Sequence, residues 1–272
     1  MVLTVLGTAA AEGWPAVFCA CEVCQLAREL GGKEIRRRAS YQVGDTIHVD
    51  WGPDSYNSMI AFDMDYSSLE HLLITHSHWD HWVPRELSWR SRGYSQIPAD
   101  SHLMVYGNSH VRERLDQELP FSLEDCALSF KQIEAFEELD LGVATAVPLP
   151  ATHAPSEQPF VFLLQVGDSE VLIGHDSGWF VDDVWDYLAT RQLTAALIDT
   201  TFGTRDERRG HMGGAAVVET MQKLEEIGAM SPDCRRIATH ISHNCGSSHE
   251  QLVDFFAPHG IEVAYDGLEV EL

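Results

Sequence analysis

Short apolar runs that end in turn-forming residues recur along the whole chain, and segments with helical periodicity separate several of them. Runs of this length, rich in Val, Ile and Leu, predict buried strands. The predicted helices cover residues 55–65, 82–92, 181–193, 212–227 and 251–256. The predicted strands cover residues 2–6, 46–49, 71–75, 103–106, 160–166, 170–173, 195–198 and 237–239, with two more within 262–270.

The order of these elements indicates the fold class. In both halves of the chain, strands that we expect to be antiparallel precede helices, which favours a layered α/β (α+β) sandwich over a doubly wound parallel sheet. Gly167-Asp168 separates two of the apolar runs and is typical of a hairpin turn. No linker or internal repeat divides residues 1–272, so we expect a single domain.

Composition agrees with an enzyme-sized globular chain. Hydrophobic residues make up 44% of the 272 residues, enough for a core that needs no metal to fold. No apolar run reaches 18 residues, so no transmembrane helix is expected. The first ten residues, MVLTVLGTAA, lack a basic segment and predict a strand, not a signal peptide. We therefore expect a cytoplasmic protein.

The chain is strongly acidic, with 18 Lys and Arg against 42 Asp and Glu and a net charge of −24. A protein of this charge lacks the positive surface that supplies most nucleic-acid affinity, so long nucleic acids are poor substrate candidates. The one basic run is KEIRRR at residues 33–38. It is either a solvated surface segment or an anion-binding lip on a pocket, where Arg37 and Arg38 would contact a phosphate.

A dense cluster of potential metal ligands follows one predicted strand. Residues 75–81 read THSHWDH and contain His76, His78, Asp80 and His81. Loops at strand ends commonly carry functional sites. In an extended segment His76 and His78 point to the same side, whereas Asp80 and His81 lie further along. The spacing therefore predicts two ions side by side, each with further ligands from elsewhere.

Three more candidate ligands stand at the ends of predicted strands. They are His153 in PATHAP, Asp176 in LIGHDSG and His240 in IATHISH. A carboxylate can bridge two ions and a neutral imidazole cannot, so Asp176 is the natural bridging ligand. A mixed set of His and Asp ligands is consistent with Zn²⁺, Mn²⁺ or Fe.

The stretch FCACEVC contains a third candidate cluster, formed by Cys19, Cys21 and Cys24. Disulfides are uncommon in cytosolic proteins of this size, and the close spacing favours a shared metal ion. Disulfides or free thiols are the alternative. Cys126 and Cys234 lie in apolar or strand-like segments, where we predict packed thiols.

The HxHxDH pattern after a strand, followed by single His, Asp and His residues at strand ends, resembles the metallo-β-lactamase superfamily. That resemblance implies an αββα four-layer sandwich with a dinuclear metal site at one edge of the sheets. It implies that Asp176 bridges the ions and that Asp50 supports the ligands from behind. By the same resemblance, one ion is bound by His76, His78 and His153, and the other by Asp80, His81 and His240.

The cysteine cluster makes the chain more similar to one group within this superfamily than to the others. Together with the RRR, THSHWDH, THISH and YDG segments, it is similar to the phosphoribosyl cyclic phosphate phosphodiesterase (PhnP-like) group of the carbon–phosphorus lyase pathway. A related accessory protein of coenzyme-PQQ biosynthesis shares the cysteines. The resemblance implies a structural Zn²⁺ in a loop at about residues 8–40, bound by Cys19, Cys21, Cys24 and His243. Cys245 is the alternative fourth ligand.

This group implies a phosphodiesterase for a small cyclic phosphate ester, such as phosphoribosyl cyclic phosphate or a nucleotide-like phosphate. The nucleophile would be a hydroxide bridging two Zn²⁺ or Mn²⁺ ions, and Asp80 and Asp50 would belong to the catalytic site. His211, in RRGHMGG, matches the residue that protonates the leaving oxygen, and it would also contact phosphate. The alternative is a solvent-exposed histidine at a helix start.

Two other functions remain open on the sequence. The first alternative is a hydrolase of another small ester or lactone. The second is a non-catalytic metal- or metabolite-binding accessory protein of cofactor biosynthesis. We expect a small-molecule phosphate ester as partner, with no long nucleic acid and no membrane, and leave open a homodimer. Four tryptophans near the predicted site are expected either to pack in the core or to narrow the pocket mouth: Trp51, Trp79, Trp82 and Trp89.

Overall fold

The computed structural model describes residues 1–272, and its strands form two sheets of seven strands each. The first sheet has the order β14 (Leu268–Glu271), β1 (Val2–Gly7), β2 (Ser40–Val43), β3 (Ile47–Val49), β4 (His71–Leu73), β5 (Leu103–Gly107) and β6 (Leu128–Gln132). The second has the order β13 (Glu262–Val263), β12 (Met230–Thr239), β11 (Leu193–Asp199), β10 (Ser169–Gly174), β9 (Phe160–Val166), β8 (Thr145–Pro150) and β7 (Leu139–Asp140).

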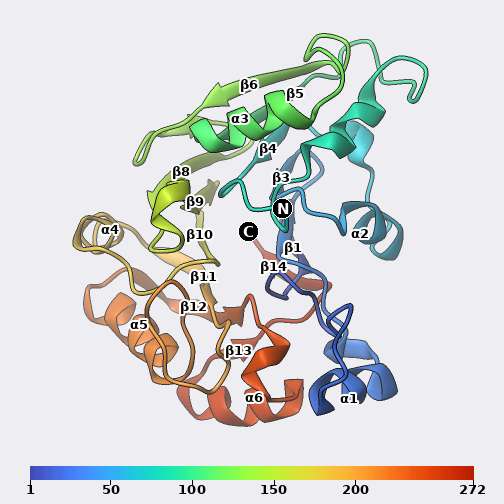
Figure 1. Cartoon of the computed structure of the whole chain (residues 1–272). Coiled ribbons are helices and arrows are strands. Elements are labelled where there is room, and N and C mark those ends of the chain that lie inside the picture. The colour runs from blue at the N-terminus through green and yellow to red at the C-terminus, as the bar shows by residue number, and fades with distance from the viewer.

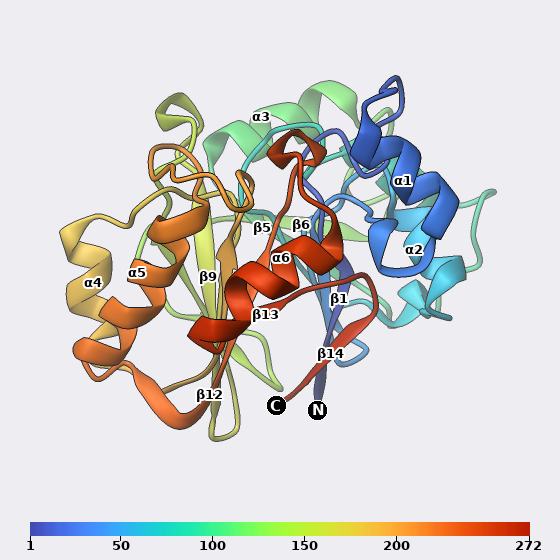
Figure 2. The same ribbon diagram turned by 90° about the horizontal axis from the view of Figure 1, so that it is seen from below.

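Helices cover the outer faces of these sheets (Figures 1 and 2). On the side of the first sheet lie α2 (Ser55–Ala61) and α3 (Ser109–Glu118). On the side of the second sheet lie α4 (Asp182–Leu188), α5 (Gly214–Glu226) and α6 (His249–Phe256). The N-terminal α1 (Glu22–Leu30) lies at the same end of the molecule as α6.

Three hydrophobic clusters explain this layering. The middle cluster fills the space between the sheets and includes Tyr41 of β2 and Phe162 of β9. One outer cluster joins α4, α5 and α6 to the second sheet and takes in Ala27 of α1. The other joins α3 to the first sheet through residues such as Leu115. The predicted αββα sandwich is therefore confirmed.

The prediction of antiparallel strands is wrong for half of each sheet. Strands β3, β4, β5 and β6 run parallel, as do β10, β11, β12 and β13. The connections between parallel neighbours carry α2, α3, α4, α5 and α6, except that the connection from β4 to β5 carries a 3₁₀ helix over Pro84–Arg90. Parallel pairing requires a long crossover of this kind, whereas the hairpin-joined strands β8, β9 and β10 are antiparallel.

The sequence analysis did not predict two of the helices, and it predicted an α-helix where the structure has a 3₁₀ helix. α1 and α3 were not predicted; α3 buries only Val111 and Leu115, so its apolar signal is weak. Its start is nevertheless well defined, because the Asn108 side chain accepts the backbone N–H groups of His110 and Val111 at 3.0 Å each. The predicted helix at 82–92 is instead a 3₁₀ helix over Pro84–Arg90. Burial of Pro84 and Leu87, three residues apart, suits three residues per turn.

None of the helices combines the length and the apolar character that crossing a lipid bilayer requires. The two chain ends lie side by side, because the Leu272 backbone N–H donates to the Met1 carbonyl at 2.8 Å. The opposite ends of β3, β4, β10 and β12 carry the residues of the candidate site.

Candidate metal centre

The candidate ligands meet where strands from both sheets end. Asp50 directly follows β3, and the 75–81 loop begins two residues after β4, its parallel neighbour. Asp176 lies two residues beyond β10, and His240 directly follows β12. Because parallel strands end at the same edge of a sheet, this topology places side chains distant in sequence next to one another.

Three of these residues have strained backbones. Asp50, Asp176 and His240 adopt φ angles of 62°, 53° and 57°, in the left-handed region that non-glycine residues rarely occupy. Each such residue costs on the order of 1–3 kcal/mol and persists where surrounding structure imposes it. The shared strain indicates that the fold holds these three side chains in a required direction.

A close backbone approach fixes the 75–81 loop. The Trp51 N–H donates to the His81 carbonyl at 2.7 Å. A Cβ on Gly52 would lie 2.1 Å from the carbonyl oxygen of Asp80, so only glycine allows this approach. The WGPD turn therefore supports the ligand loop from the neighbouring strand end.

The first ligand group contains three histidines. Donor nitrogens of His76, His78 and His153 lie within 4.8 Å of one another. His153 Nε2 is 3.4 Å from His78 Nδ1 and 3.8 Å from Asp176 Oδ1. Burial, the largest effect, lowers the pKa of both His76 and His153, so both imidazoles are neutral and can donate a lone pair to a cation.

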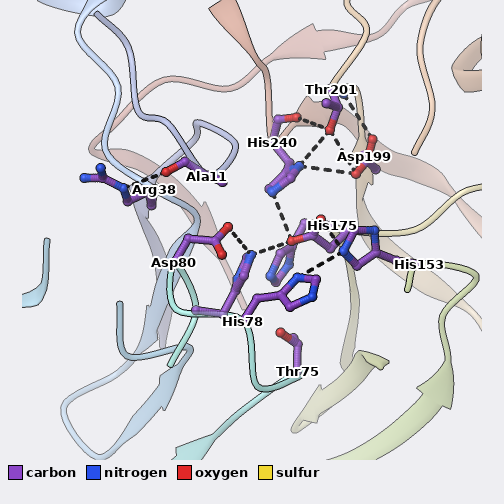
Figure 3. Close-up of polar contacts among 12 residues, drawn as sticks. Ala11, Arg38, Thr75, His78, Asp80, His153, His175, Asp199, Thr201 and His240 are labelled. Carbon is purple, nitrogen blue, oxygen red and sulfur yellow. Dashed lines mark hydrogen bonds and ion pairs between the residues drawn. The ribbon is translucent and has the colours of Figure 1, made fainter. Parts of the chain in front are cut away.

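The second ligand group surrounds the other Asp176 oxygen. Asp176 Oδ2 is 2.5 Å from His81 Nε2 and 3.1 Å from His240 Nε2. Asp80 Oδ2 lies 3.0 Å from His81 Nε2. The structure thus brings together all seven candidate ligands expected from the sequence, with one oxygen of Asp176 directed to each group. Figure 3 shows four of them, His78, Asp80, His153 and His240, around one centre.

The unpaired atoms of this site fit metal ions. His76 Nε2, His81 Nε2, His240 Nε2 and Asp176 Oδ2 are buried, and although the last three lie close together, none of the four makes a hydrogen bond of acceptable geometry. Burial opposes a charge on His81 and His240, but the surrounding carboxylates outweigh burial and raise the pKa of both, that of His240 to about 10. Surroundings that favour a proton on each nitrogen favour a divalent cation in its place.

Asp50 orients His81 of the second group through a hydrogen bond on the side of the ring away from the other ligands. Its Oδ2 accepts hydrogen bonds from His81 Nδ1 and His175 Nε2, both at 2.7 Å, and its Oδ1 accepts the Thr75 N–H at 2.9 Å. Burial alone would raise the pKa of Asp50, but His81 and His175 outweigh it and lower the pKa. The bond to His81 Nδ1 leaves Nε2 free for a metal.

Asp199 plays the same part in the second sheet, and sequence reasoning did not assign it a role. Its Oδ2 lies 3.2 Å from His240 Nδ1 and accepts from His211 Nδ1 at 3.0 Å. Its Oδ1 accepts the backbone N–H groups of Thr201 and Met212. The available signal was the position of Asp199 at the end of a buried strand. The fully buried His175 was likewise left unassigned.

His211 is on the wall of a pocket above the ligands. The pocket has a volume of about 440 Å³ and is also lined by residues of both ligand groups and by Trp79. Burial opposes a positive His211, but Asp199 and Asp176 outweigh it and raise its pKa. The Asp199 bond uses Nδ1, so Nε2 remains available to a molecule in the pocket.

The structure does not bring Arg37 and Arg38 into this pocket. Arg38 forms a two-pronged ion pair with Asp54 at 3.0 and 3.1 Å, and its Nε donates to the Ala11 carbonyl. Its guanidinium points away from the histidines (Figure 3). Arg37 contacts Asp266 at 3.3 Å.

Comparison with known proteins decides the family. A family model described as a beta-lactamase superfamily domain matches residues 46–241, which include all seven ligands. The chain belongs to this superfamily. With its clustered ligand atoms, this superfamily member is a metal-dependent hydrolase. No curated protein sequence matches the chain.

Solved structures of superfamily members share the whole fold. A diphosphatase of the PhnP family is 23% identical to this chain and has a TM-score of 0.77. The match covers 100% of this chain and 97% of the diphosphatase chain. Zinc-bound PqqB from Methylobacterium extorquens is 17% identical, covers 100% of both chains and has a TM-score of 0.74. The short form of human tRNase Z is 14% identical, covers 100% and 99%, and has a TM-score of 0.68.

The superfamily domain carries a second potential metal site in its N-terminal loop. Donor atoms of Cys19, Cys21, Cys24 and His243 lie within 4.8 Å of one another. His243 Nδ1 is 3.7 Å from Cys19 Sγ and 3.5 Å from Cys21 Sγ. Burial raises the pKa of the Cys24 thiol to about 12, so its thiolate requires a cation beside it. The alternative ligand, Cys245, lies outside this group, with Sγ directed to Ser247.

The tryptophans divide between core and surface. Trp82 is fully buried in the outer cluster of the first sheet, and Trp51 packs against that cluster. Trp79 and Trp89 are half exposed, and of these only Trp79 lines the pocket. Core packing thus explains Trp82 and Trp51, whereas Trp79 forms an aromatic part of the pocket wall.

The Asp50→Asn substitution should weaken binding of the ion held by His81 about 10–100-fold. Asparagine carries one acceptor oxygen, so it cannot accept from His81, His175 and Thr75 together. Metal titration against a chelating dye measures the change. Asp168→Asn, on the exposed Gly167-Asp168 turn, is the matched control and should have no effect. Equal affinities in both variants would contradict the role assigned to Asp50.

The Cys21→Ser substitution should remove one zinc per chain and lower the melting temperature, because a four-ligand site loses a thiolate. Elemental analysis and thermal unfolding measure both effects, with Cys234→Ser as control. The Ile241 N–H donates to the Thr8 carbonyl, so the loop is joined to the strand end that bears His240. If turnover and the catalytic ions survive loss of this zinc, the site does not support His240.

Proposed function

We propose that the chain is a dinuclear-metal phosphodiesterase for small phosphodiesters, cyclic phosphate esters among them. The observation that carries this proposal is the position of the Asp176 carboxylate, whose two oxygens face two separate ligand groups. A shared carboxylate between two such groups suits a pair of neighbouring ions. The position of His211 on the wall of the same pocket supports a role for it on a bound substrate.

Residues of the first group, His76, His78 and His153, would hold one ion, and Asp80, His81 and His240 the other. Their mix of imidazole and carboxylate donors suits Zn²⁺ or Mn²⁺. When bound, two divalent ions supply a nucleophilic hydroxide at neutral pH and offset negative charge on the phosphate. The third site, with its cysteines and His243, suits a structural Zn²⁺.

His211 supplies the proton that a leaving alkoxide needs. Its Nδ1 is held by Asp199, which fixes the ring and favours its protonated form, so Nε2–H faces the pocket as a donor. Thr201 Oγ1, 3.2 Å from the same Nδ1, restrains the ring further. This pair of Asp199 and His211 thus acts as a general acid on the leaving oxygen.

The pocket favours small substrates. A volume of about 440 Å³ accommodates a sugar phosphate or a mononucleotide, and its lining contains no Lys or Arg to follow a polymer backbone. One other candidate, which the sequence leaves open, is a metal- or metabolite-binding protein without turnover. A lactone or carboxylic ester hydrolase would use the same metal chemistry, and substrate assays separate the three.

The metal-loaded protein should hydrolyse bis(p-nitrophenyl) phosphate, and Asp80→Ala should abolish this activity by removing a ligand of the second group. Release of p-nitrophenolate after reconstitution with Mn²⁺ or Zn²⁺ measures both. The exposed Asp168→Asn variant is the control for nonspecific damage. Absence of turnover on phosphodiesters and lactones, with both ions bound, would instead support a binding protein.

The His211→Ala substitution should slow hydrolysis of alkyl phosphodiesters about 10²–10⁴-fold and hardly affect nitrophenyl esters. A nitrophenolate leaves without protonation, whereas an alkoxide does not. The measurement is kcat/KM for both substrate types in the wild type and the variant. Equal losses on both would show that His211 is not the general acid.

A further inference from the structure

Glu12, in the N-terminal loop, lies on the wall of the pocket that contains the metal ligands. Its Oε1 accepts hydrogen bonds from the Ser242 hydroxyl and from Asn244 Nδ2, the latter at 2.9 Å. His243 Nε2 lies 3.5 Å from the same oxygen. Because His243 Nδ1 faces the cysteines, this imidazole joins the potential zinc site to Glu12.

The other oxygen of this carboxylate is free. Glu12 Oε2 has no hydrogen bond or ion pair with the protein, and the side chain is 30% exposed. Two hydrogen bonds anchor this carboxylate at Oε1, so Oε2 offers an acceptor to a molecule in the pocket. A substrate hydroxyl or N–H is the natural partner for this oxygen.

No Lys or Arg side chain lines the pocket beside Glu12. The pocket lining contains Glu12, Asp80 and Asp176 but no Lys or Arg. The nearby basic run is neutralised within the protein: Arg38 by Asp54 and Arg37 by Asp266. Two bound ions and a protonated His211 would offset one phosphate at the ligand groups, but a second phosphate near Glu12 would meet a carboxylate with no Lys or Arg on the pocket wall to balance it.

We propose that Glu12 is a specificity-determining residue, which admits phosphodiesters carrying a hydroxyl or N–H donor and rejects those carrying a second phosphate. This inference rests on the proposed phosphodiesterase function. It separates the chain from enzymes that act on diphosphates or on phosphorylated sugar phosphates. Arg and Lys form strong charge-assisted hydrogen bonds with a phosphate, whereas the Glu12 carboxylate repels one.

Binding of non-reacting nucleotides tests this charge selection directly. Isothermal titration calorimetry of the Zn²⁺-loaded protein compares adenosine 3′-monophosphate with adenosine 3′,5′-bisphosphate. We expect the wild type to bind the monophosphate at least about tenfold more tightly, a difference of about 1.4 kcal/mol. Glu12→Gln should reduce this ratio toward one, because the amide removes the charge at nearly constant shape.

Two further variants separate charge from structure. Glu12→Asp keeps the charge and should keep most of the selectivity. Glu29→Gln removes the same charge from an exposed position of α1 and should leave the ratio unchanged. Zinc content and melting temperature of each variant verify the fold. An unchanged ratio in Glu12→Gln, or no preference in the wild type, would overturn the inference.

Turnover distinguishes this inference from the proposed function. The substrates are adenosine 2′,3′-cyclic phosphate and its 5′-phosphorylated form. Hydrolysis of both at equal kcat/KM in wild type and Glu12→Gln keeps the phosphodiesterase function and refutes selection by Glu12. No hydrolysis of either, with a binding ratio that Glu12→Gln reduces, refutes the phosphodiesterase function and supports selection by Glu12.

Discussion

The buried Asp176 carboxylate is the constraint on which the rest of the site depends. Its two oxygens face two groups of imidazoles, and the buried Nε2 atoms of His76, His81 and His240 make no hydrogen bond. Such a set of buried polar atoms is stable only when cations or protons balance it. The strained backbones of Asp50, Asp176 and His240 indicate that packing of the two sheets, not local preference, imposes this arrangement.

Each sheet contributes one further buried carboxylate behind the ligands. Asp50 of the first sheet contacts His81, and Asp199 of the second contacts both His240 and His211. These bonds fix which ring nitrogen faces the metal side, and they preorganise the site before an ion binds. Asp199 thereby links His240 to His211, so a candidate metal ligand and the proposed general acid share one anchor.

Charge distribution explains how an acidic protein can act on anions. Net charge is −24, and the pocket itself lacks Lys and Arg. Attraction for a phosphate must then come from the ligand groups, where divalent ions fit, and from His211. The arginines at 37 and 38 serve the fold, since both are paired with carboxylates outside the pocket. One well-placed phosphate is favoured under these conditions, and additional negative charge is not.

The sequence by itself determined the layered fold class and the candidate metal ligands, because THSHWDH concentrates four of these in one loop and the other three follow apolar strands. Weakly apolar helices such as α3, and the parallel strand directions, depend on long connections that no local pattern records. Only the tertiary structure decided the roles of His175 and Asp199, and it placed Arg38 outside the pocket and Glu12 inside. Those roles are set by partners up to 232 positions away, as between Glu12 and Asn244, and such pairings arise from packing of the sheets.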